Sequence, residues 1–405
     1  FAYLLQVEFE RDGIQLPEKE RDLLRAMNST LVHLETMFGR NMMEQERLFQ
    51  VPSSAVENMP TDLWAHLPQA PRGSVNLSTE PRVVQPFLRL CPDPDMRKAV
   101  YETFHATTQA NVPVLEDLIW KRYEAAHRLG FKSHGHKVLH NTIASDTDSA
   151  TAFLEAVTRG VQPQAQSEVE ALLELKCQVE GPNAAPELHQ WDLPFYMGLA
   201  KSMADVDNTE VSRYFPVERL EEGLVTLCKR LFQIEAEVSD APPGETWAKG
   251  VRKLTLRHPS QGPLGIVYLD LAPRQGKYGH AAHFTVRCGR AITAEEALEL
   301  DEHHHHEGYQ LPIVTLVMNI GSGSGTRRLA SHGELETLLH EFGHAMHSLL
   351  SRTQFQHLSG TRGASDFIET PSQLFEYFAW DQTFLGHFTE HERTGSRQVP
   401  QEILD

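Results

Sequence analysis

The chain has 405 residues and a formal net charge of −18, because Asp and Glu outnumber Lys and Arg by 55 to 37. This balance argues against a nucleic-acid-binding protein, since such proteins neutralise phosphates with clustered cations. With 40% hydrophobic and 23% charged residues, the composition predicts a globular protein with a sizeable core. The longest apolar stretch, residues 311–320, is too short to span a membrane.

Hydrophobic periodicity predicts a mainly helical chain with one small sheet. Apolar residues recur at helical spacing in four parts of the sequence: 1–47, 96–129, 150–179 and 217–234. Prolines and Gly73 mark residues 51–80 as a long connection or the edge of a subdomain. The period then changes, and three short runs rich in β-branched and aromatic residues predict strands: 265–271, 283–288 and 312–319. The sheet is therefore expected just ahead of residue 334.

An HExxH motif follows that sheet, with its polar residues at His340, Glu341 and His344. Residues four apart on a helix are neighbours, so both imidazoles can reach one metal ion at about 2.0–2.1 Å. An apolar stripe centred on Phe342 lies on the other side of the helix and predicts packing against a core. This pattern favours a catalytic zinc site over a surface helix with an accidental His pair. Glu341 would be the general base for a water whose pKa zinc lowers to about 7.

Such a site needs a third protein ligand. A third His in the pattern HExxHxxGxxH is excluded, because Leu350 occupies its position. Four carboxylates remain open as candidates: Asp366, Glu369, Glu376 and Asp381. Spacing favours Glu369 narrowly, because residues 370–373 resemble a capping box with Pro371 at the first helical position, which holds Glu369 just ahead of a helix. Asp366 and Glu376 are expected to orient the ligand imidazoles.

The segments HEFGHAMH (340–347) and DFIETPSQ (366–373) resemble the paired motifs of the thimet oligopeptidase family of zinc metallopeptidases. The likeness covers most of the chain from about residue 97. Within the family, segments 123–131 and 356–362 are most similar to the mitochondrial intermediate peptidases. The resemblance implies that His340, His344 and Glu369 bind one zinc ion and that Glu341 is the general base.

The same resemblance implies a neurolysin-like, two-lobed helical fold with a small β-sheet beside the HExxH helix. Residues 1–96 would form an N-terminal helical region and residues 97–405 the catalytic domain. Family members continue past the position of Asp405 with a segment that supplies oxyanion donors, so we expect a C-terminally incomplete catalytic domain. The strand over 312–319 is expected to pair its exposed edge with substrate.

The implied activity is that of a zinc metalloendopeptidase cleaving oligopeptides or unfolded precursor N-termini. The subfamily likeness implies a monomeric enzyme of the mitochondrial matrix that removes a short N-terminal peptide from imported precursors. Two alternatives stay open. One is a general oligopeptidase of the cytosol or an organelle, and the other is a truncated product that binds zinc or a peptide without catalysis.

Overall fold

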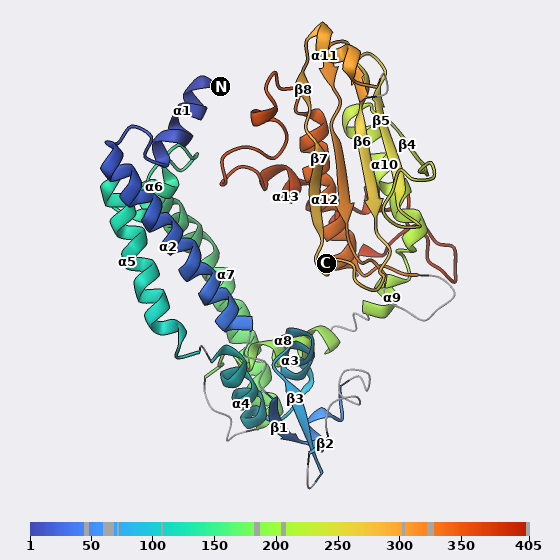
Figure 1. The fold of residues 1–405 in the computed structure, drawn as a ribbon. Helices are drawn as coiled ribbons and strands as arrows, with labels where there is room; N and C mark the ends of the chain where they lie inside the picture. Colours follow the sequence, from blue (N-terminus) through green and yellow to red (C-terminus); the bar gives the residue numbers. More distant parts are fainter. Residues whose placement is uncertain are drawn as a thin grey trace. The chain divides into compact units, whose positions relative to one another are not determined.

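A computed structural model describes residues 1–43, 48–59, 69–70, 73–106, 108–181, 187–203, 208–301, 304–321 and 328–401. By its contacts the chain divides into two compact units, Ala2–Asp205 and Val206–Asp405 together with Phe1. The predicted mainly helical class is confirmed (Figure 1). The expected boundary between residues 96 and 97 stays a prediction. Within the described ranges, no helix is both long enough and apolar enough for a membrane span.

The unit Ala2–Asp205 is built from helices and one three-stranded sheet. Its helices are α1 (Ala2–Arg11), α2 (Glu18–Met43), α3 (Pro81–Leu90), α4 (Pro94–His105), α5 (Asn111–Arg128), α6 (His134–Leu139), α7 (Thr147–Glu180) and α8 (Leu193–Met203). Its antiparallel strands are β1 (Leu48–Pro52), β2 (Gln69–Ala70) and β3 (Ser74–Ser78), in the order β1-β3-β2. The helices predicted over 1–47, 96–129 and 150–179 are confirmed in their described parts, and residues 44–47 lie outside the described residues.

The connection predicted over residues 51–80 is wrong in part. Its described portions carry β2, β3 and the end of β1, and residues 60–68 and 71–72 lie outside the described residues. Val75 and Leu77 alternate with polar residues along β3 and are fully buried against Phe87 of α3. This alternation is the usual signal of a half-buried strand, but here it extends over only two apolar residues.

A buried charge network ties α4, α7 and α8 together. The Arg97 guanidinium donates to Asp192 Oδ1 at 2.7 Å, and Lys176 Nζ donates to Asp192 Oδ2 at 2.8 Å. The side chains of all three residues are at most 3% exposed. Burial by itself would raise the pKa of Asp192, but the hydrogen bonds from Arg97 and Lys176 outweigh it and lower that pKa. The carboxylate is therefore the shared counter-ion of two buried cations.

Replacing Asp192 with Ala is expected to lower the free energy of unfolding by about 3–5 kcal/mol, because it leaves two buried cations without their carboxylate. Since folding lowers the pKa of Asp192, its contribution is present above the ordinary value of 3.8 and is lost as the pH falls below it. Denaturant unfolding measures the loss. Asp22→Ala, which removes an exposed pair with Arg25, is the control and should cost less than about 1 kcal/mol. If both variants lose the same free energy of unfolding, the buried network stabilises the fold no more than the exposed pair does.

The unit Val206–Asp405 carries a five-stranded sheet with helices around it. Its helices are α9 (Asn208–Ser212), α10 (Val217–Phe232), α11 (Ala294–Glu299), α12 (His332–Leu350), α13 (Thr370–Glu376) and α14 (Gln382–Leu385). The main sheet contains β4 (Glu235–Asp240), β5 (Arg252–His258), β6 (Gly262–Asp270), β7 (Ala282–Arg287) and β11 (Ile313–Val317). A smaller sheet contains β8 (Arg290–Ala291), β9 (His305–His306) and β10 (Tyr309–Gln310).

The order of the main sheet is β4-β5-β6-β11-β7, with β11 parallel to β6 and the other neighbours antiparallel. The three predicted strands are confirmed as β6, β7 and β11. The expectation that the strand over 312–319 offers its edge to substrate is wrong, because β11 is hydrogen-bonded on both sides. The edge beside α12 belongs to β7 instead.

One hydrophobic core joins the sheet to α10 and α12. Neighbouring residues of β6 and β11, such as Val267 and Val314, point to the same face and are fully buried. The predicted apolar stripe of α12 packs against this face, and Phe342 at its centre is 0% exposed. Figure 1 shows α12 beside β7, and the helix contacts β7, β11 and β6. The sheet therefore fixes the helix that carries the HExxH motif.

Candidate metal centre

Helix α12 starts at a well-formed cap. The Ser331 hydroxyl accepts from the Glu334 backbone N–H, and the Glu334 carboxylate accepts from the Ser331 backbone N–H. This capping box and the buried stripe together fix where the helix starts and which side faces the core. His340 and His344 consequently lie away from the core, with ring centroids 4.9 Å apart.

Glu369 comes from the turn ahead of α13. The predicted start of this helix at Thr370 is confirmed, and Pro371 lies in its first turn. The predicted capping box is wrong, because the N-cap is Glu369 and no side chain caps the helix. The Thr370 backbone N–H donates to the Phe367 carbonyl oxygen instead. A turn over residues 367–370 therefore precedes the helix where a capping box was predicted, and Glu369 lies in this turn.

Three side chains converge to form a group able to hold a metal ion: His340, His344 and Glu369. Their ligand atoms all lie within 4.8 Å of one another. Glu369 Oε2 is 3.0 Å from His344 Nε2 and 3.3 Å from His340 Nε2. Two imidazoles and one carboxylate suit a zinc ion, and a tetrahedral zinc would keep a fourth position for water or substrate. The donor set therefore fits the group that the sequence predicts.

A second carboxylate contacts His340. The Glu376 carboxylate accepts a hydrogen bond from His340 Nδ1 at 2.6 Å. This bond places the proton on Nδ1 and leaves the lone pair of Nε2 directed at the convergent group. Glu376 therefore contacts His340 at the ring nitrogen that an orienting residue would use, and that role stays a prediction.

Glu376→Ala is expected to weaken zinc binding about 10- to 100-fold, because it frees the imidazole of His340 and lowers its basicity. Glu376→Gln should have a smaller effect, since its amide oxygen still accepts from Nδ1. Competition with a chelator of known affinity measures both losses. If the Ala variant binds zinc as tightly as the wild type does, Glu376 does not orient a ligand.

Glu341 lies beside the convergent group without belonging to it. Glu341 is 8% exposed. Burial raises the pKa of its carboxyl, whereas His340 and a hydrogen bond from the backbone N–H of His283 act to lower that pKa. A buried carboxylate with a raised pKa is suited to accept a proton from water. Its position on α12, one residue after His340, matches the predicted role of a general base.

His283 is a member of the site that the sequence reasoning missed. It lies on the edge strand β7, with its ring centroid 6.0 Å from that of His344, and its Nε2 is 3.2 Å from Ser348 Oγ. Burial, followed by the nearby His344 and His347, lowers its pKa to about 4, so the ring is neutral at pH 7. Nothing local distinguishes this His from others, because its role depends on how β7 packs against α12.

The other candidate carboxylates lie elsewhere. Asp381 caps α14, with Oδ1 accepting from the Phe384 backbone N–H at 2.6 Å. Asp366 is exposed in the turn ahead of α13. Among the described residues, His344 Nδ1 is buried without a hydrogen-bond partner, so Asp366 does not orient that imidazole in this structure. An orienting role for Asp366 stays a prediction.

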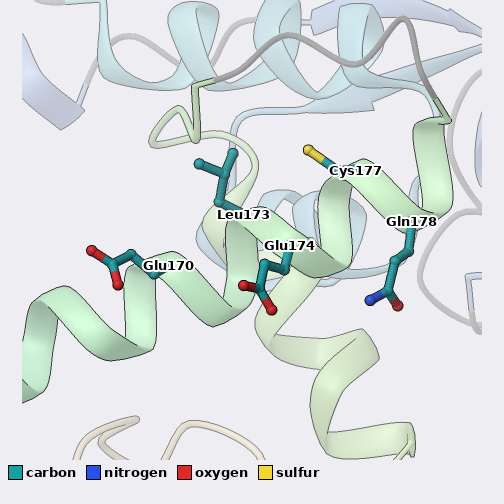
Figure 2. A pocket seen from close by; sticks show the side chains of 5 residues that line it. All are labelled: Glu170, Leu173, Glu174, Cys177 and Gln178. Atoms are coloured by element: carbon teal, nitrogen blue, oxygen red, sulfur yellow. The ribbon is translucent and has the colours of Figure 1, made fainter.

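An open depression on α7 is separate from this group. Figure 2 shows the side chains that line it, all on one stretch of that helix: Glu170, Leu173, Glu174, Cys177 and Gln178. None of these is a predicted site residue, and the depression contains no group of His and carboxylate side chains. The convergent group on α12 and α13 is therefore the candidate site.

Comparison with known proteins points to one family. The model of peptidase family M3 matches residues 87–405. The chain is 35% identical to the mitochondrial intermediate peptidase of Arabidopsis thaliana, an alignment covering 100% of this chain and 58% of that protein. It is 32% identical to the enzyme of the same name from Homo sapiens, over 97% of this chain and 52% of that protein. The chain thus spans about half the length of the curated relatives it matches.

A solved structure of PZ peptidase A with an inhibitor also matches, with a TM-score of 0.36 and 15% identity. That match covers 89% of this chain and 49% of the other.

Proposed function

The chain belongs to peptidase family M3, and from this premise we propose that it is a zinc-dependent metalloendopeptidase holding one zinc ion per chain. The observation that carries the proposal is the convergence of His340, His344 and Glu369 on one point, with the Glu341 carboxyl beside them. Two imidazoles and one carboxylate around an open position are a common donor set of catalytic zinc sites.

His340, His344 and Glu369 would hold the zinc ion, which would supply Lewis-acid chemistry toward a peptide carbonyl and lower the pKa of water. Glu341 takes the proton of the attacking water and gives it to the leaving amine. Glu376 holds the His340 ring in place through Nδ1. His283 supports Glu341 through its backbone N–H, and therefore connects the general base to strand β7.

Strand β7 supports the proposal that the substrate binds in an extended conformation. Within the described part of the main sheet it is the edge strand next to α12. Edge strands bind peptides by adding one strand to the sheet through main-chain hydrogen bonds. A peptide bound in this way would run past the site group, which suits oligopeptides or unfolded precursor N-termini and excludes folded segments.

The curated relatives are named mitochondrial intermediate peptidases. We therefore propose that the substrates are precursors imported into the mitochondrial matrix, from which a short N-terminal peptide is removed by a monomeric enzyme. The net charge of −18 supports this substrate class, because it attracts basic targeting peptides over long range.

Zinc content and cleavage of a quenched fluorescent peptide test the proposal together. We expect one zinc per chain and metal-dependent cleavage that the removal of zinc abolishes. A chain without zinc would refute the metal site, whereas zinc without cleavage would favour a non-catalytic binding product. Two extended peptides of equal length, one basic and one with acidic replacements, then test the substrate class. Equal rates for both would favour a general oligopeptidase.

A further inference from the structure

The helix α13 packs closely against α12 at Gly343, the fourth residue of the HExxH motif. A Cβ atom at this position would lie 2.6 Å from Ser372 Cα and 2.8 Å from the Pro371 carbonyl oxygen. Both are backbone atoms, so rotation of a side chain cannot relieve the overlap. Only a residue without a Cβ allows α13 to pack at this distance.

The residue that meets Gly343 also holds the Glu369 carboxylate. Ser372 is 0% exposed, and its Oγ is 3.0 Å from Glu369 Oε2 and 2.9 Å from the Glu369 carbonyl oxygen. Oε2 is the atom that lies 3.0 Å from His344 Nε2. An unbroken set of contacts therefore leads from Gly343 through Ser372 to the convergent group.

We propose that Gly343 and Ser372 are positioning residues that set the distance between the Glu369 carboxylate and the two imidazoles. Gly343 fixes how closely the backbone of α13 approaches α12, and the Ser372 hydroxyl fixes the rotamer of Glu369. The inference deepens the proposed function, because it assigns to both residues an effect on metal affinity.

The distances indicate how sensitive the site is. With a Cβ at residue 343, α13 would have to move by about 0.8 Å to bring the Ser372 Cα from 2.6 Å to an ordinary contact of 3.4 Å. Metal–ligand distances in protein sites are held within about 0.2 Å of their ideal values. The required movement exceeds this tolerance, so Glu369 could not keep its place beside both imidazoles.

The test compares zinc affinity in three variants of the full chain, by competition with a chelator. Gly343→Ala is expected to weaken zinc binding about 10- to 100-fold, and Ser372→Ala about 10-fold, the range seen when groups that orient metal ligands are removed. Gly333→Ala is the matched control, because Gly333 lies on the same helix and nothing lies within 4 Å of its added Cβ. It should bind zinc like the wild type and increase thermal stability, as Ala does in an open helix.

The visible absorption of the cobalt-loaded chain supplies a readout that a merely structural role would not move. We expect Gly343→Ala and Ser372→Ala to change this spectrum and Gly333→Ala to leave it unchanged. Should Gly343→Ala fail to fold, judged by circular dichroism, Ser372→Ala decides. Unchanged zinc affinity in Ser372→Ala, or in a folded Gly343→Ala, would overturn the inference while leaving the proposed function intact. A wild-type chain that binds no zinc would refute the proposed function, and the inference with it.

Discussion

Glu341→Gln is expected to reduce peptide cleavage about 10²- to 10⁴-fold, the usual contribution of a positioned general base, while zinc stays bound. The amide has the shape of the carboxyl but cannot accept the proton of the attacking water. Zinc should remain because Glu341 is not a member of the group formed by His340, His344 and Glu369. Cleavage of a fluorescent peptide and zinc content, measured on the same preparation, check the two halves of this expectation.

Glu336→Gln is the matched control for that variant. Glu336 lies on the same helix and accepts a hydrogen bond from Trp380 Nε1 at 2.9 Å, which a Gln oxygen can also accept. It should retain both zinc and cleavage. Turnover that survives in Glu341→Gln would remove the general-base role, and loss of zinc in that variant would show that Glu341 supports the metal site.

Local spacing predicts the part of the site that lies on one helix. His340 and His344 are four residues apart, so helix geometry alone brings them together, and the stripe around Phe342 predicts which side of α12 is buried. Both features depend only on the period of the helix, and the structure has them as expected. The strands β6, β7 and β11 could likewise be found, because each is a short run rich in β-branched and aromatic residues.

Features that depend on contacts between distant segments could not be read in this way. The order of strands in the sheet is not encoded in any one strand, so the sequence of residues 312–319 does not reveal that β11 is an inner strand. Leu254 and Leu256 alternate with polar and charged neighbours in β5, and both are fully buried. Such alternation signals a half-buried strand, but here it extends over only two apolar residues.

The carboxylate of the convergent group shows the same limit. Spacing left four carboxylates open, and only the packing of α13 on α12 brings Glu369 to the imidazoles. The predicted capping box over 370–373 would pair Thr370 with Gln373, whereas in the structure the Ser372 hydroxyl donates to Glu369.

Glu369→Ala is expected to weaken zinc binding about 10²- to 10³-fold. Structural zinc sites with four ligands bind with about 10–16 kcal/mol, so one ligand accounts for roughly 2.5–4 kcal/mol, and each 1.4 kcal/mol is a factor of about ten. This loss should exceed the 10- to 100-fold effect of Glu376→Ala, because Glu376 reaches the group only through His340. The reverse order, measured by chelator competition, would make Glu376 the third ligand.

Zinc-dependent thermal stability gives an independent measure of the same loss, because a ligand stabilises the folded state according to its concentration relative to Kd. At a zinc concentration about 1,000 times the wild-type Kd, the wild type should gain about 4.1 kcal/mol. A variant that binds about 1,000-fold more weakly would gain only about 0.4 kcal/mol at the same concentration. His347→Gln is the control, since His347 does not belong to the convergent group and its replacement should preserve the full gain. A full gain in Glu369→Ala would show that Glu369 is not a zinc ligand.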